Sequence, residues 1–153
     1  IGHLQKNKTR KVLPLCGCLH TIDSLGLAQQ VDRIAGELGL RPRVLLQVNV
    51  AEDEAKFGFT GAEVREQGPD IAALEHLDLG GLMTIPAFQP DPESVRPHFA
   101  RLRELRDQME SEQGLVLPEL SMGMSHDFSV AIEEGATLVR VGSSIFGKRN
   151  NAT

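Results

Sequence analysis

The stretch Arg43-Val-Leu-Leu-Gln-Val-Asn49 is nearly continuous in apolar character. A strand inside a parallel sheet has this composition because helices cover both of its faces. Other short apolar or β-branched runs recur along the chain and alternate with longer stretches of helical spacing, which predicts βα units. The candidate strands are residues 1–4, 12–19, 44–50, 77–84, 119–122 and 138–141.

Four amphipathic helices are predicted between these strands, at residues 24–38, 61–73, 92–113 and 126–134. Polar caps and glycines mark most of their ends: Asp23 or Ser24, Asp91 and Ser125 at the starts, and Gly39, Gly114 and Gly135 at the stops. Strands and helices in this order fit an open doubly wound sheet or part of a (β/α)8 barrel. The pattern alone does not choose between the two.

Length and charge narrow the class of protein. The 153 residues suit one domain, in which only residues 150–153 form a loose tail. The formal net charge of −5 argues against binding to nucleic acid through its phosphates. The chain also has no apolar run near the roughly 20 residues of a membrane helix. We therefore expect a cytoplasmic protein with no nucleic-acid or membrane partner.

The two cysteines, Cys16 and Cys18, are separated by one residue. They supply at most half of a tetrahedral zinc site unless His3 or His20 joins them. Residues at i and i+2 on a strand share one face, so two small apolar residues on one face of a strand are the favoured interpretation. We expect no metal site.

Polar residues close or follow several of the predicted strands. Side chains at the carboxyl ends of parallel strands gather at one edge of the sheet or barrel, where ligands bind. These ends therefore hold the candidate functional residues. They are His3, His20, Asn49, Met83 with Thr84, Ser125 and Arg140.

Two of these strand ends together suggest an anion site. In Ser121-Met-Gly-Met-Ser125, the last serine is predicted to cap a helix, where it offers a hydroxyl beside free backbone amides. Gly142, Ser143 and Ser144 follow the last strand, and a glycine there lets amides approach a phosphate closely. Arg140 lies within that strand, where an inward guanidinium needs a hydrogen-bond partner. A ligand heteroatom is the natural candidate.

Several motifs together resemble the pyridoxal phosphate homeostasis protein family, and the resemblance spans nearly the whole chain. They are Ile1-Gly-His-Leu-Gln-Lys-Asn-Lys8, His20-Thr-Ile-Asp-Ser24, Gln47-Val-Asn49, Lys56-Phe-Gly58, Gly81-Leu-Met-Thr84, Ser121-Met-Gly-Met-Ser125 and Val139-Arg-Val-Gly-Ser-Ser-Ile-Phe-Gly147. The resemblance implies the α/β fold of the alanine racemase-like class, a (β/α)8 barrel of the TIM type. The cofactor it implies is pyridoxal 5′-phosphate (PLP).

The resemblance also implies roles for individual residues. Ser125, Gly142 and Ser143 would hold the phosphate, and Arg140 would face the pyridine nitrogen. A fixed cation at that position keeps the nitrogen unprotonated. The remaining cofactor-binding residues implied are Met124, Asn49 and His3.

Members of this family bind the cofactor through a Schiff base to a lysine at the end of the first strand. The five lysines here, Lys6, Lys8, Lys11, Lys56 and Lys148, all belong to other motifs. A complete barrel takes about 250 residues, so we expect residues 1–149 to be a partial PLP-binding barrel, from about strand 3 to strand 8. Binding of PLP is then noncovalent at best, and unpaired barrel edges favour self-association.

The expected function is PLP binding in intracellular vitamin B6 homeostasis, without catalytic activity, with PLP-dependent apo-enzymes as possible recipients of the cofactor. The chain stops soon after the last strand, without the further domain that supplies a second acid or base in racemases of this fold. One alternative is a small fold-type III PLP enzyme, similar to an amino-acid racemase. A phosphate-ligand module, or a metal protein that uses Cys16 and Cys18, is another.

Overall fold

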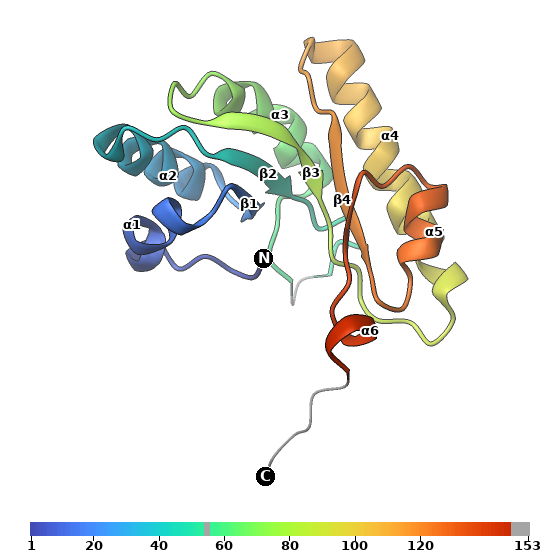
Figure 1. The fold of residues 1–153 in the computed structure, drawn as a ribbon. Helices are drawn as coiled ribbons and strands as arrows, with labels where there is room; N and C mark the ends of the chain where they lie inside the picture. Colours follow the sequence, from blue (N-terminus) through green and yellow to red (C-terminus); the bar gives the residue numbers. More distant parts are fainter. Residues whose placement is uncertain (54–55, 148–153) are drawn as a thin grey trace.

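A computed structural model of the chain describes residues 1–53 and 56–147, so the tail expected at residues 150–153 lies outside the described residues. The described part is built on a curled parallel sheet of five strands in the order β1-β2-β3-β4-β5 (Figure 1). The strands are β1 (Cys18–Ile22), β2 (Arg43–Gln47), β3 (Asp78–Met83), β4 (Glu119–Met124) and β5 (Leu138–Arg140).

Helices lie between successive strands and cover the outer face of the sheet (Figure 1). The α-helices are α1 (Thr9–Val12), α2 (Leu25–Leu38), α3 (Gly61–Ala72), α4 (Arg96–Gln113), α5 (Phe128–Glu133) and α6 (Ser143–Phe146). Three 3-10 turns, η1 (Lys6–Lys8), η2 (Leu13–Leu15) and η3 (Pro92–Val95), complete the described elements. None of the described helices is long and apolar enough to cross a membrane.

Local sequence signals account for most of the helix ends. Of the two predicted caps of α2, Asp23 and Ser24, the structure selects Ser24, whose side chain accepts a hydrogen bond from the amide of Leu27. Gly39 and Gly114 take the left-handed conformation at the ends of α2 and α4, as expected of closing glycines. Asp91 caps the short turn η3, which leads into α4.

The first predicted strand is absent and the second is misplaced. Residues 1–4 form no strand, residues 12–15 are helical, and β1 begins only at Cys18, so the sheet has five described strands rather than six. Pro14 has no amide hydrogen for a strand ladder and lies in the first turn of η2, which its fixed φ suits. Leu4, in the irregular segment before η1, and Leu13, in η2, are still buried in the core, so apolar residues alone did not distinguish these structures from strands.

The two faces of the sheet differ in chemistry. The outer face packs against α2 to α5 in one apolar core, which includes Val31, Leu46, Leu82, Phe99 and Leu120. The inner, concave face carries buried apolar residues such as Leu45 and Met83 together with polar side chains from several strands. The candidate site lies at the carboxyl ends of these strands.

Candidate functional site at the carboxyl ends of the strands

Arg140 closes β5 and is buried, with 8% of its surface exposed. Its NH1 donates to Ser121 Oγ at 2.6 Å, and its NH2 donates to the backbone carbonyl of Thr84 at 2.8 Å. Among the described residues, its Nε is buried and has no hydrogen-bond partner. Two of the three guanidinium nitrogens are therefore held by the protein, and the third, Nε, remains for a ligand acceptor.

The charge of Arg140 persists despite its burial. Burial lowers the pKa of Arg140 to about 10, and the carboxylate of Asp127 acts in the opposite direction. The guanidinium is therefore cationic at neutral pH. A cation fixed beside a ligand atom that accepts a hydrogen bond disfavours protonation of that atom.

Of the two residues that hold Arg140, sequence reasoning named Thr84 as a candidate but missed Ser121. Ser121 lies on the concave face of β4, and its Oγ is also 2.9 Å from Nδ1 of His20 on β1. His20 and Ser121 are 101 residues apart, so no local pattern connects them. The available signal was a hydroxyl within an otherwise apolar strand, since a buried hydroxyl requires a partner.

Ser125 lies beside the start of α6 and not at the start of α5. Its Oγ accepts hydrogen bonds from the amides of Gly142, at 2.9 Å, and Ser144, at 3.3 Å. The expectation that Ser125 caps α5, the helix that follows it, is wrong, because α5 begins only at Phe128 with Asp127 as its N-cap residue. A turn from Met124 to Asp127 separates the strand from the helix and directs Ser125 toward β5.

Two backbone amides thus converge on one oxygen at the start of α6. The Ser125 hydroxyl, which accepts from both amides, still has its own hydrogen to donate, as to a phosphate oxygen. An added Cβ at Gly142 would meet no heavy atom within 4 Å, so the space beside this backbone is open within the described structure. Ser143, next in the chain, is exposed.

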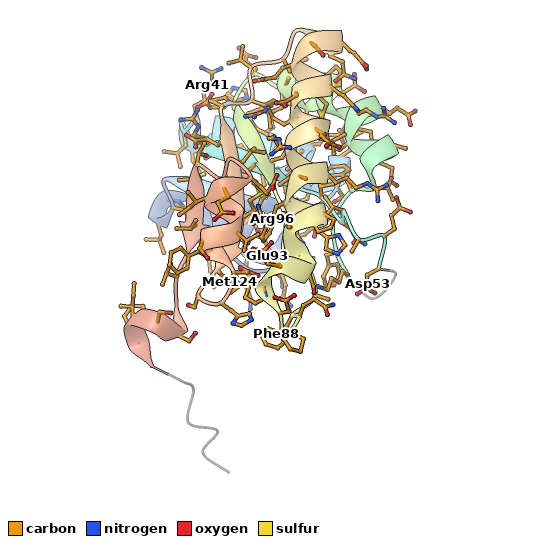
Figure 2. All side chains as sticks on the ribbon, turned by 90° about the vertical axis from the view of Figure 1, so that its right-hand side faces the viewer. Arg41, Asp53, Phe88, Glu93, Arg96 and Met124 are labelled. Carbon is orange, nitrogen blue, oxygen red and sulfur yellow. The ribbon has the colours of Figure 1, made fainter. Side chains whose placement is uncertain are left out.

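Met124 completes this group of residues. It is 45% exposed at the end of β4 and lies opposite Arg140 in the strand register. Figure 2 shows Met124, Phe88 and Asp53 at one end of the molecule and Arg41, which precedes β2, at the other. We call Met124, Ser125, Arg140 and residues 142–144 the β4–β5 rim.

His3 and Asn49 lie in a second group, which we call the β1–β2 rim and define as His3, Asn49 and Phe57. The ring of His3 stacks on that of Phe57 with centroids 4.4 Å apart, and its Nδ1 is 3.0 Å from Asp23 Oδ2. The Asn49 side chain donates to the Asp53 carbonyl at 2.8 Å and accepts from the Asp53 amide at 3.2 Å. These side chains therefore have protein partners of their own.

Both predicted residues of the β1–β2 rim line one cavity of about 250 Å³. A larger hollow of about 780 Å³ extends from Asn49 toward α3 and α4 and includes neither Ser125 nor Arg140. The structure thus gathers the predicted site residues into two groups at the carboxyl ends of the strands. It places Ser125, Arg140 and Gly142 in one and His3 and Asn49 in the other.

The cysteines lie away from both rims, before and at the start of β1. Cys16 and Cys18 are free thiols, and burial is the main factor that raises the pKa of Cys18. Within residues 1–53 and 56–147, no group of three or more His, Cys, Asp or Glu side chains is placed to hold a metal ion.

Comparison with known proteins gives consistent matches over nearly the whole chain. Residues 2–150 match the family model "Alanine racemase, N-terminal domain". The pyridoxal phosphate homeostasis protein of Aquifex aeolicus is 44% identical over 149 residues, which are 97% of this chain and 65% of that protein. The protein of the same name from Synechocystis sp. is 41% identical, over 97% of this chain and 68% of its own length. The chain thus spans about two thirds of these relatives.

Solved structures give the same result. The structure of PipY from Synechococcus elongatus with PLP bound superposes with a TM-score of 0.89 at 38% identity, over 96% of this chain and 68% of PipY. Alanine racemase from Clostridium difficile superposes with a TM-score of 0.78 at 20% identity, over 99% of this chain and 42% of the racemase. At that identity the second match shows a shared fold only.

Proposed function

This chain belongs to the pyridoxal phosphate homeostasis protein family, within the alanine racemase N-terminal domain fold, and from this premise we propose that it binds pyridoxal 5′-phosphate at the β4–β5 rim. One observation carries the proposal. Arg140 is buried and held at NH1 and NH2, while its buried Nε has no partner among the described residues. A buried donor without a partner is costly, which favours a ligand acceptor at this position.

Each residue of the rim has a proposed task. Ser125, Gly142 and Ser143 bind the phosphate, and the amides of residues 142 and 144 hold the Ser125 hydroxyl in place for it. Arg140 donates from Nε to the ring nitrogen of the cofactor and, as a fixed cation, keeps that nitrogen unprotonated. Met124, which is exposed beside Arg140, contacts the ring.

His3 and Asn49 are proposed to complete the site from the β1–β2 rim. Both line the 250 Å³ cavity at the same end of the sheet. Their side chains already have protein partners, so we expect them to shape the site more than to supply affinity. In this proposal residues 1–149 form one PLP-binding unit, and the contacts described here are noncovalent.

We propose a role in intracellular PLP homeostasis rather than catalysis, as the names of the relatives suggest. Bound PLP supplies a reactive aldehyde, and this chain's residues hold its phosphate and its ring. A cofactor ring whose nitrogen is unprotonated is a weak electron sink. This property suits storage of the cofactor better than turnover of amino acids. Cytoplasmic apo-enzymes that depend on PLP are the proposed recipients. Racemisation of an amino acid by the purified chain with PLP would contradict the non-catalytic role.

Titration of the purified chain with PLP, followed by calorimetry, tests the binding site. We expect Arg140→Met to weaken binding about 10- to 100-fold, because it removes a charged hydrogen bond. Ser125→Ala is expected to weaken it about 2- to 10-fold, because it removes a neutral hydrogen bond. The matched controls are Arg41→Met, at the opposite end of the molecule (Figure 2), and Ser129→Ala, which is exposed on α5.

The loss of affinity in Ser125→Ala is expected for PLP and not for pyridoxal, which has the same ring but no phosphate. Equal losses for the two ligands would show that Ser125 does not bind the phosphate. Binding of PLP that is unchanged in Arg140→Met would remove the β4–β5 rim as the site.

We also propose that the chain self-associates through its strand edges. Within the described residues, β1 and β5 each pair with a neighbour on one side only. Such edges are templates for pairing with another chain. Sedimentation velocity is expected to show a mass that rises with concentration, and a monomer at every concentration would contradict this.

A further inference from the structure

The hydrogen bond from Arg140 to Ser121 leaves the Ser121 hydroxyl able to donate in the next bond of the network. A guanidinium only donates, so Ser121 Oγ is the acceptor in the 2.6 Å contact with Arg140 NH1. The hydroxyl hydrogen of Ser121 is then available for His20 Nδ1, 2.9 Å away. For this bond to form, Nδ1 has to accept, so His20 is neutral and carries its proton on Nε2.

We propose that His20 is a positioning residue for PLP: through Ser121 it orients the guanidinium of Arg140 so that Nε faces the ring nitrogen of the cofactor. This inference rests on the proposed function and adds a residue that lies on a different strand from the β4–β5 rim. His20 acts through Ser121 and Arg140 and does not itself contact the cofactor.

The two supports of the guanidinium differ in kind. Thr84, whose carbonyl accepts from NH2, is held by backbone and side-chain bonds, since its amide donates to the Ser121 carbonyl at 3.1 Å and its Oγ1 donates to the Val48 carbonyl at 2.8 Å. The NH1 support is a hydroxyl that is free to rotate unless a third group fixes its hydrogen. His20 supplies that third group. Because the guanidinium is planar, holding NH1 and NH2 also sets the direction of Nε.

Electrostatics favour the neutral form of His20. Burial lowers its pKa below the ordinary value of 6.5, and the charge of Arg140 lowers it further. The other charged groups that act on His20 are the N-terminal ammonium, which also lowers the pKa, and Glu119 on β4, which raises it. Arg43 on β2 and Asp78 on β3 act on the neighbouring Cys18.

Protonation of His20 would reverse the hydrogen bond between His20 and Ser121. Nδ1 would then donate to Ser121 Oγ, which would receive two donors and turn its own hydrogen away. A second cation would also lie near the guanidinium. The proposal therefore predicts that the part of PLP affinity that depends on Arg140 is lost as the pH falls through the pKa of His20.

The experiment compares two ligands across three variants. The ligands are PLP and its 1-deaza analogue, in which a carbon replaces the ring nitrogen. The variants are His20→Leu, which removes the acceptor, His20→Asn, whose side-chain oxygen keeps an acceptor near Nδ1, and His98→Leu on α4 as the matched control. Calorimetry gives the affinity of each pair.

We expect His20→Leu to weaken PLP binding about 2- to 10-fold, as for one neutral hydrogen bond, and to leave binding of the deaza analogue unchanged. His20→Asn is expected to restore PLP binding to within about 2-fold and to abolish the part of its pH dependence that His20 causes. Equal losses for both ligands, or full affinity of His20→Leu for PLP, would overturn the proposal.

A measurement without ligand separates this inference from the proposed function. In the nitrogen-15 NMR spectrum of the free chain, His20 is expected to show the Nε2–H tautomer. The Nε–H signal of Arg140 is expected to exchange slowly with solvent, and faster in His20→Leu than in His98→Leu. An Nδ1–H tautomer, or unchanged exchange, would overturn the positioning role even if PLP binds. Failure of the wild-type chain to bind PLP, with these signals as expected, would instead contradict the proposed function alone.

Discussion

The two rims at the carboxyl ends of the strands are built in different ways. In the β4–β5 rim, Arg140 is held by Thr84 and Ser121, and Ser125 is held by the amides of residues 142 and 144. These bonds join segments that are 17 to 56 residues apart, so the sheet itself sets their geometry. In the β1–β2 rim, Asn49 bonds to Asp53, only four residues away, and the exposed ring of His3 stacks on Phe57.

This difference separates a preformed part of the site from one that loop packing sets. Groups that are anchored to neighbouring strands change position little when a ligand arrives, so they provide affinity without a large entropic cost. Groups on loops adapt more easily and contribute less. We therefore expect substitutions in the β4–β5 rim to have the larger effects on both folding and PLP binding.

The largest effect is expected at Gly123, which shapes the β4–β5 rim. It has a φ of +90°, and an added Cβ would lie 2.6 Å from the Ala131 Cβ and 3.0 Å from the Phe128 Cα. Gly123→Ala should lower the free energy of unfolding by about 2–4 kcal/mol, through backbone strain and overpacking. Urea denaturation measures this change.

Gly142→Ala is the matched control for Gly123. Gly142 has an ordinary φ of −118°, and its added Cβ would meet no heavy atom within 4 Å. The free energy of unfolding should change by no more than about 0.5 kcal/mol, whereas PLP affinity should fall because the methyl group occupies the proposed phosphate space. If both variants lose stability equally, Gly123 is not the tightly packed position, and Gly142 not the open one, that the structure shows.

A smaller effect is expected on the pH dependence of stability. The folded chain lowers the pKa of His20 below 6.5, so the unfolded chain takes up a proton that the folded chain resists. The stability from neutral His20 is complete above pH 6.5 and decreases as the pH falls from there toward the pKa in the folded chain. Urea denaturation measures the free energy of unfolding at about pH 7.5 and about pH 5.5. The decrease in this free energy between the higher and the lower pH should be smaller for His20→Asn than for the wild type.

The smallest effects on PLP affinity are expected in the β1–β2 rim. His3→Ala and Asn49→Ala should each weaken PLP binding by no more than about 3-fold, because both side chains already have protein partners. Asn49→Ala should also lower the free energy of unfolding by about 1 kcal/mol, since it removes two bonds to the Asp53 backbone. A loss at His3 as large as that in Arg140→Met would show that this rim supplies the affinity.

The sequence predicted the βα order and the strand ends that carry the site. Arg140 was identified because a charged side chain within a β-branched strand requires a partner, and Gly142 because a glycine there allows a close approach. The same reasoning failed at residues 12–15, where an apolar run fits a helical turn as well as a strand. It also failed at Ser125, because serine is common both in caps and in turns.

What the sequence by itself determined is therefore local: the periodic apolar faces, the caps at Ser24 and Asp91, and the residue types at each strand end. Only the tertiary structure decided which of these residues meet. His20, Ser121 and Arg140 come from three strands of the sheet, and their contacts depend on strand register and on the curl of the sheet, which no short segment encodes. The physical reason is that hydrogen bonds act over about 3 Å in space, whatever the separation along the chain.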